Sequence, residues 1–144
     1  MSNLYVISIA LTIGANVSYH LFQKSISVNA HPMISLAVTY VVALVATCVV
    51  LPFLNLRGGL VGQLMALNWA TFALGVSLLA LELGFLLAYR AGWQISIAAV
   101  FSNVAVTVLL IPIGIIFFKE RLNLYNVIGI LLAVASLWLM SKRS

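Results

Sequence analysis

Five long apolar segments dominate the sequence, and each is close to the length that crosses a lipid bilayer. A helix needs about 20 predominantly apolar residues to span the hydrocarbon core. The chain has 144 residues, of which 65% are hydrophobic and 6% are charged. A chain this short has too little interior to hide so much apolar surface from water, so the surplus is expected to face lipid. The predicted membrane helices cover residues 4–22, 32–54, 69–89, 95–118 and 124–140.

The connections between these segments are short, and they predict the fold class. The stretch Asn55–Gly62 contains Gly58 and Gly59, a composition typical of a loop. Short links make consecutive helices antiparallel neighbours. No Lys or Arg precedes the first segment, which is long and carries polar residues, so we interpret it as a retained helix and not as a signal peptide. We therefore expect an all-α integral membrane protein with one transmembrane domain over residues 1–144, multi-pass in the cell inner (plasma) membrane.

The charged, cysteine and histidine residues argue against several classes of function. The net charge is +5, but the seven Lys and Arg residues are spread singly, and basic residues at the ends of membrane helices are ordinary. We therefore expect no nucleic-acid partner. The single cysteine, Cys48, excludes an internal disulfide, and His20 and His31 lack the spacing of a ligand cluster. With no nucleophile–base pair and no nucleotide-binding loop, we expect no metal, no cofactor and no enzymatic activity.

The distribution of basic residues between the two sides gives almost no preference for one orientation in the membrane. Basic loops face the cytoplasm in most membrane proteins, yet five helices place three basic residues on one side and four on the other. Such a weak bias permits insertion in both orientations, and two opposed copies would reproduce the inverted repeat of many transporters. The alternative, a single orientation set by the order of insertion, stays open. The residues are Arg57, Lys119 and Arg121 on one side, and Lys24, Arg90, Lys142 and Arg143 on the other.

Polar side chains form a stripe along one face of the first segment and of the fourth. Residues three and four apart lie on the same side of a helix, and such stripes are candidates for lining a hydrated cavity. The alternative is hydrogen bonding between helices without a further function. The stripes are Thr12, Asn16, Tyr19, His20 and Gln23 in the first segment, and Ser96, Asn103, Thr107 and Gly114 in the fourth. The residues predicted to bind a substrate are Asn16, Tyr19, His20, Asn103, Thr107 and Tyr89.

Glu82 is the most informative single residue, because it lies near the middle of the third segment. An acid at the centre of a membrane helix costs roughly 2.5–3.5 kcal/mol on insertion scales, so it is expected to face the interior of the bundle. There it could exchange a proton for a cationic substrate, and the nearby rings of Phe85 and Tyr89 would suit a cation. We assign Glu82 a proton-coupling role. The alternative is a glutamate with a purely structural role.

Three stretches resemble a known family. FFKERLNLYNVIGILLAVASLWLM is similar to the end of an EamA-type repeat of the drug/metabolite transporter superfamily, with Glu120, Arg121 and Gly129 in the matching places. IGANVSYHLFQKS resembles the first helix of that repeat, through Gly14, Asn16 and Lys24. LAYRAGWQISIAAV resembles the joint between its third and fourth helices. The resemblance covers essentially the whole chain as one five-helix unit, half of an inverted-repeat transporter, and implies a homodimer or a paired subunit.

The first helix departs from the small multidrug exporters of this superfamily, which place their essential glutamate there. This chain has no acid in its first segment. Proton-coupled cation export therefore cannot be carried over to this chain residue by residue. The residues and the resemblance together predict a membrane transporter of small metabolites or of amphipathic or cationic compounds, working by alternating access as a dimer that can be antiparallel. Its expected partners are a small-molecule substrate, the lipid bilayer and a second copy of the chain. The alternative function is an accessory membrane subunit that supports another transporter or enzyme.

Overall fold

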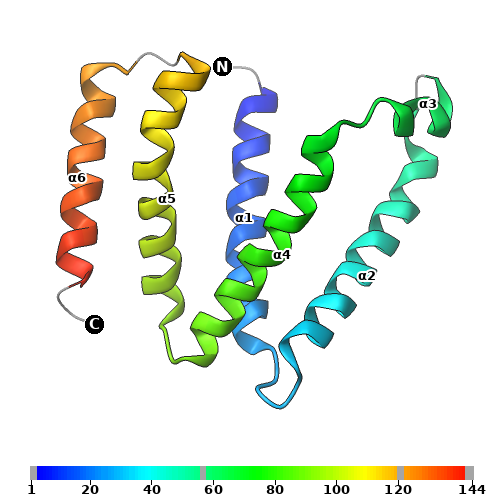
Figure 1. The fold of residues 1–144 in the computed structure, drawn as a ribbon, viewed down its shortest axis with the longest axis horizontal. Helices are drawn as coiled ribbons and strands as arrows, with labels where there is room; N and C mark the ends of the chain where they lie inside the picture. The colour runs from blue at the N-terminus through cyan, green and yellow to red at the C-terminus, as the bar shows by residue number, and fades with distance from the viewer. Residues whose placement is uncertain (1–2, 56–57, 120–121, 142–144) are drawn as a thin grey trace. The chain divides into compact units, whose positions relative to one another are not determined.

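The computed structural model describes residues 3–55, 58–119 and 122–141, and every regular element in these ranges is helical (Figure 1). The residues group into two compact units, Met1–Ala91 and Gly92–Ser144, which are described separately. The prediction of one transmembrane domain stays a prediction. The elements are α1 (Asn3–Ser25), α2 (Pro32–Val50), η1 (Leu51–Phe53), α3 (Gly59–Met65), α4 (Trp69–Arg90), α5 (Ile95–Phe118) and α6 (Leu124–Ser141).

Helices α1, α2, α4, α5 and α6 coincide with the five predicted segments to within a few residues. The prediction of a loop over Asn55–Gly62 is wrong in part, because α3 begins inside it. Gly58 and Gly59 have φ angles of 78° and 70°, a left-handed conformation that favours glycine. The two glycines therefore do make a turn, but a short helix follows it directly.

Several predicted features fall on residues outside the described ranges. Among them are four basic residues of the topology count and two residues of the family resemblance, one of which is shared between the two sets. They are Arg57, Glu120, Arg121, Lys142 and Arg143.

Four helices in the described part of the chain are long and apolar enough to cross a membrane, which fits a membrane protein. They are Leu4–Ser25 of α1, α2 with η1, α4 and α5, with 22, 22, 22 and 24 residues. Most of the large apolar side chains of these helices are exposed, as lipid-facing residues would be. Helix α6 is apolar but shorter, so a fifth crossing stays a prediction.

In the first unit, α4 is the central helix, because it packs against both α1 and α2 (Figure 1). Its start is capped by Asn68, whose side-chain oxygen accepts a hydrogen bond of 3.1 Å from the Ala70 amide, which satisfies one of the free amides of the first turn. The most deeply buried apolar side chains of the chain's described residues are Leu36 of α2 and Leu86 of α4, each 1% exposed. The tight packing of this unit therefore lies where α4 approaches its end.

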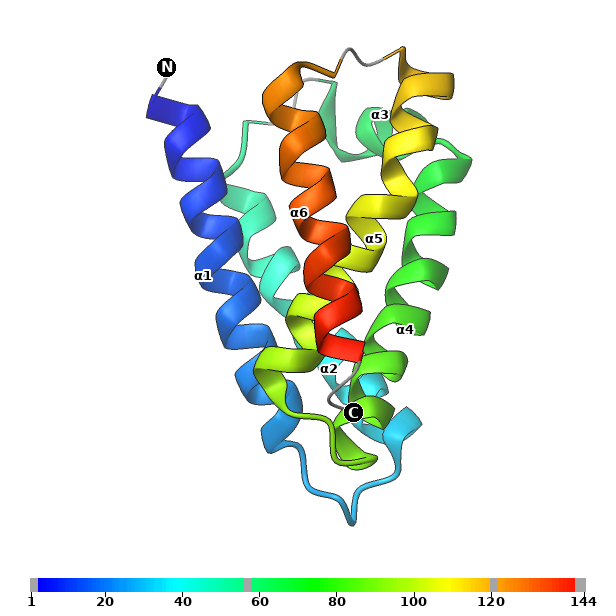
Figure 2. The same cartoon turned by 90° about the vertical axis from the view of Figure 1, so that its left-hand side faces the viewer.

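The second unit is an antiparallel pair formed by α5 and α6 (Figure 2). Helix α5 runs unbroken through Pro112 and ends at Lys119, which has a left-handed φ of 53°. The side chain of Asn123 then accepts a hydrogen bond of 2.8 Å from the Asn126 amide at the start of α6. A left-handed residue after one helix and a side-chain cap before the next fit a tight reversal of the chain.

Candidate functional site

Glu82 is buried inside the first unit, as the sequence predicted, with 8% of its surface exposed. It lies on the face of α4 that packs against its neighbours, together with Leu86 and Tyr89. The apolar residues on either side of it in the sequence are more exposed. An acid in this position is withdrawn from water on all sides, and its charge needs partners within the protein or from a ligand.

Two hydrogen bonds tie α1 to α4 around this acid. The side-chain amide of Gln23 donates to the Glu82 backbone carbonyl at 2.7 Å. The Tyr89 hydroxyl lies 2.8 Å from Nδ1 of His20, and it donates to that nitrogen when Nδ1 is unprotonated. Gln23 and His20 are 6% and 5% exposed. Polar groups on two helices thus satisfy each other in the packed interface, which stabilises association of membrane helices.

Aromatic rings from the same two helices surround this interface. The His20 ring meets the ring of Phe85 edge to face, with centroids 4.8 Å apart. Tyr19 makes similar edge contacts with His20 at 5.1 Å and with Phe85 at 6.1 Å, and Phe85 stacks on Tyr89 at 6.0 Å. These distances are in the range in which aromatic pairs attract. The rings also offer negative faces to a cation.

Three polar atoms here are buried without a hydrogen-bond partner among the described residues: the hydroxyls of Tyr19 and Tyr40 and the Oε2 atom of Glu82. Both hydroxyls lie close enough to the Glu82 carboxyl to interact with it electrostatically. The Tyr40 hydroxyl comes near enough to this carboxyl to interact with it, but not in regular hydrogen-bond geometry. Buried polar groups without partners are rare in native proteins and call for an explanation.

We refer to these residues together as the Glu82 cluster. Its members come from three helices of the first unit, and each contributes a polar group or a ring to one buried region. The arrangement can hold a proton on the carboxyl, and an ionised carboxylate beside aromatic rings can hold an organic cation. The cluster consists of Tyr19, His20 and Gln23 of α1, Tyr40 of α2, and Glu82, Phe85 and Tyr89 of α4.

The structure brings together four of the seven predicted site residues: Tyr19, His20, Glu82 and Tyr89. Asn16 is exposed on α1, one helical turn away from the cluster. The polar stripe of α1 is therefore buried only in its second half. These positions come from geometry alone, and a substrate-binding role stays a prediction for each residue.

The remaining two predicted residues, Asn103 and Thr107, belong to α5 of the second unit. Both are exposed within that unit. The Thr107 hydroxyl donates to the Asn103 backbone carbonyl at 2.8 Å, so it is satisfied within its own helix. Their part in a shared cavity stays a prediction.

Sequence reasoning missed Tyr40 altogether and treated Gln23 only as part of the polar stripe. Gln23 carried a usable signal, because a long amide inside a membrane segment must find a partner. Tyr40 carried a weaker one, since it is the one tyrosine in the predicted segment 32–54. Its approach to Glu82 depends on how α2 packs on α4, which periodicity within one helix does not reveal.

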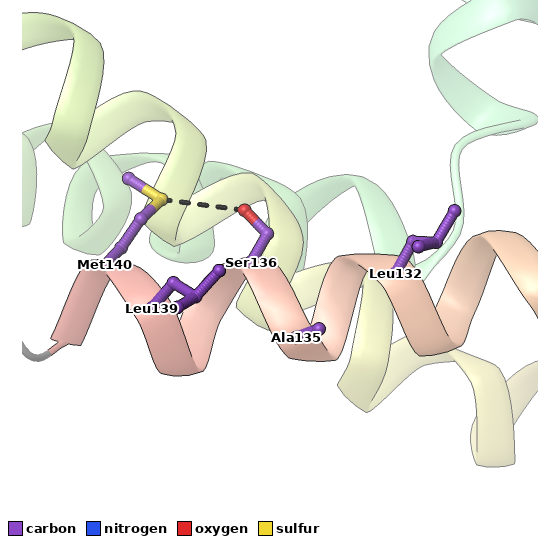
Figure 3. Close-up of a pocket in the computed structure, with 5 residues that line it drawn as sticks. All are labelled: Leu132, Ala135, Ser136, Leu139 and Met140. Carbon is purple, nitrogen blue, oxygen red and sulfur yellow. Dashed lines mark hydrogen bonds between the residues drawn. The ribbon is translucent and has the colours of Figure 1, made fainter.

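A pocket on α6 differs in character from the Glu82 cluster (Figure 3). One helix supplies all of its lining, which is apolar except for Ser136, and the Ser136 hydroxyl donates to the Met140 sulfur at 3.8 Å. This face suits packing against lipid or another helix, and it offers no charge to a substrate. The lining residues are Leu132, Ala135, Ser136, Leu139 and Met140.

Comparisons with known proteins add no identification. The chain has no significant match among models of protein families, curated proteins or solved structures. Within the described residues, no group of three or more His, Cys, Asp or Glu side chains could hold a metal ion. The Glu82 cluster is therefore interpreted from its own geometry.

Proposed function

We propose that the chain is a transporter protomer for small amphipathic cations, with the Glu82 cluster as its binding site. The observation that carries the proposal is the group of buried polar atoms around Glu82 that have no partner in regular hydrogen-bond geometry: Oε2 of the acid and the hydroxyls of Tyr19 and Tyr40. A soluble enzyme would not expose so much apolar surface, and a purely structural helix pair would gain stability by satisfying or replacing these groups.

A cation accounts for the chemistry of the cluster better than an anion does. The acid supplies the negative charge, and the rings of His20, Phe85 and Tyr89 supply aromatic surface. One cation already lies on this aromatic surface, because the Lys24 ammonium is 5.5 Å from the centroid of the Tyr89 ring. An amphipathic cation can reach such a site through an apolar medium, which suits its position between apolar helices.

Transport requires that the site opens to both sides of the membrane in turn, and we propose that a second copy completes the transporter. Alternating access in many transporters uses two inverted repeats around a central site. The weak bias of the basic residues supports two opposed copies, in agreement with the resemblance to a single EamA-type repeat. A reporter fused to the C-terminus should be detected on both sides of the membrane. Detection on one side alone would exclude the opposed pair.

The decisive experiment measures uptake into vesicles that contain only this protein. A labelled aromatic quaternary ammonium ion would be offered under an imposed pH gradient. Glu82→Gln keeps the size of the side chain and removes the charge, so uptake should fall about tenfold or more, the loss expected for a buried charged contact of at least about 1.4 kcal/mol. Glu120→Gln is the matched control, since it removes the only other acidic charge of the chain.

Binding should also depend on pH in a defined direction. A proton and a cation compete for one carboxylate, so the affinity for a permanently charged cation should fall as the pH falls. Glu82→Gln should bind weakly at every pH. An unchanged pH dependence in this variant would remove the coupling role. If the wild-type protein moves no cation, the alternative function of an accessory membrane subunit gains support.

A further inference from the structure

A small cavity lies in the first unit where α1 and α4 end, apart from the unpartnered atoms of the Glu82 cluster. Its volume is about 140 Å³, well above the roughly 10–15 Å³ that a single water molecule needs. Two cations, Lys24 and Arg90, line it together with the amide of Gln23 and the apolar side chains of Ile26 and Leu86. No acidic side chain is part of the described lining.

Both cations are fixed in position by backbone carbonyls. The Arg90 guanidinium donates through one terminal nitrogen to the carbonyls of Ser27 at 3.1 Å and Ala30 at 2.6 Å. The Lys24 ammonium donates to the Tyr89 carbonyl at 3.1 Å and lies 5.5 Å from the centroid of the Tyr89 ring. A ligand that binds here would therefore meet charges already held in place, which reduces the entropy lost on binding.

The position of both cations at the ends of helices explains part of their arrangement. Lys24 and Arg90 lie in the last turns of α1 and α4, where the helix dipole favours a positive charge. The dipole does not explain why both side chains line one cavity, since like charges close together repel. Nor does it explain the Nε atom of Arg90, which is buried and has no hydrogen-bond partner among the described residues. An oxyanion would relieve the repulsion and could accept from the guanidinium.

We propose that this cavity binds a phosphate oxyanion, supplied by the headgroup of an anionic membrane lipid. Phosphate oxygens match the fork of an arginine and the point charge of a lysine. The ends of membrane helices lie at the level of the headgroups, and basic pockets between membrane helices hold anionic headgroups in other proteins. Free inorganic phosphate has the same chemistry, so the source has to be tested. The site does not depend on the proposed transport of cations.

The test measures lipid binding to the full chain purified in detergent. Phosphatidylglycerol, phosphatidylcholine or inorganic phosphate would be added, and thermal stability and lipid retained in native mass spectrometry would be recorded. Phosphatidylglycerol should raise the melting temperature and stay bound, and phosphatidylcholine should do so much less. Lys24→Gln and Arg90→Gln should weaken phosphatidylglycerol binding about tenfold or more. Arg90→Lys keeps the charge and loses the fork, so it should bind at an intermediate level.

Lys119→Gln is the matched control, because it removes an exposed positive charge that is not part of this lining. It should bind phosphatidylglycerol like the wild type. Stabilisation by inorganic phosphate to the same extent would confirm the oxyanion site and identify free phosphate as its source. Equal binding of the two lipids, or equal weakening by Lys119→Gln and Lys24→Gln, would overturn the proposal. If Arg90→Gln does not fold, Lys24→Gln and Arg90→Lys still decide the question.

Discussion

In α1, the side chains of His20 and Gln23 reach across to α4, whereas in α5 the hydroxyl of Thr107 bonds to the carbonyl of Asn103 in its own helix. Both helices carry a polar stripe, and both must satisfy polar groups in an apolar medium. Hydroxyls of Ser and Thr can return to a carbonyl four residues earlier. Imidazole and long amide groups do not make that bond here and pair with a neighbouring helix.

The described helices show the same difference between hydroxyls, which bond within their own helix, and longer polar side chains. Among the described residues, six further Ser and Thr hydroxyls donate to the carbonyl four residues before them, at 2.8–3.1 Å. His20 and Gln23 of α1 and Glu82 of α4 lie in the packed region instead. Long polar side chains are therefore better indicators of a site than hydroxyls are, because the hydroxyls need no partner beyond their own backbone. The hydroxyls are those of Thr12, Ser18, Ser25, Thr39, Thr47 and Ser77.

The largest effect on stability is expected where the first unit packs most tightly. Leu86→Ala removes a side chain that is 1% exposed and leaves a cavity beside the Glu82 cluster. We expect the free energy of unfolding to fall by about 2 kcal/mol, the low end for buried leucines, because lipid solvates the removed atoms as well as the protein does. Leu109→Ala in α5 is the control, since Leu109 is 66% exposed. Unfolding in detergent would measure both, and equal losses would refute the contrast between the two regions.

A smaller change in the free energy of unfolding, of opposite sign, is expected at Tyr40. Its hydroxyl is buried with no partner in regular hydrogen-bond geometry, so Tyr40→Phe should stabilise the ligand-free protein by about 1 kcal/mol. The same change should weaken cation binding, because the bound state would lose a hydroxyl next to Glu82. Tyr125→Phe removes a hydroxyl from a residue that is 83% exposed and should change neither quantity. A destabilised Tyr40→Phe variant would show that the hydroxyl has a structural partner after all.

The sequence predicts the helices well and the site only in part. Runs of apolar residues place α1, α2, α4, α5 and α6, because length and hydropathy are local properties of the chain. The start of α3 at Gly59 was not predicted, since a composition rich in glycine favours a loop. Burial of Glu82 followed from the cost of a charge in an apolar helix. The approach of Glu82 to Tyr40 could not be predicted from the sequence. This contact depends on the packing of α2 against α4, which has no signature within either helix.

The smallest expected change in the free energy of unfolding tests hydrogen bonds between helices against hydrogen bonds within one helix. Tyr89→Phe removes the bond to His20 between α4 and α1. Bonds between membrane helices contribute on average about 0.6 kcal/mol, with a maximum near 1.7, so we expect a loss in this range.

Thr107→Val is the matched change in α5, because it removes a hydroxyl that bonds within its own helix. The carbonyl of Asn103 keeps its place in the helix, so the expected loss is close to zero. Both variants would be compared in the same detergent by unfolding at equilibrium. If Thr107→Val costs as much as Tyr89→Phe, the α5 stripe also forms contacts beyond its own helix, and Asn103 and Thr107 regain their place beside Glu82 as candidate binding residues.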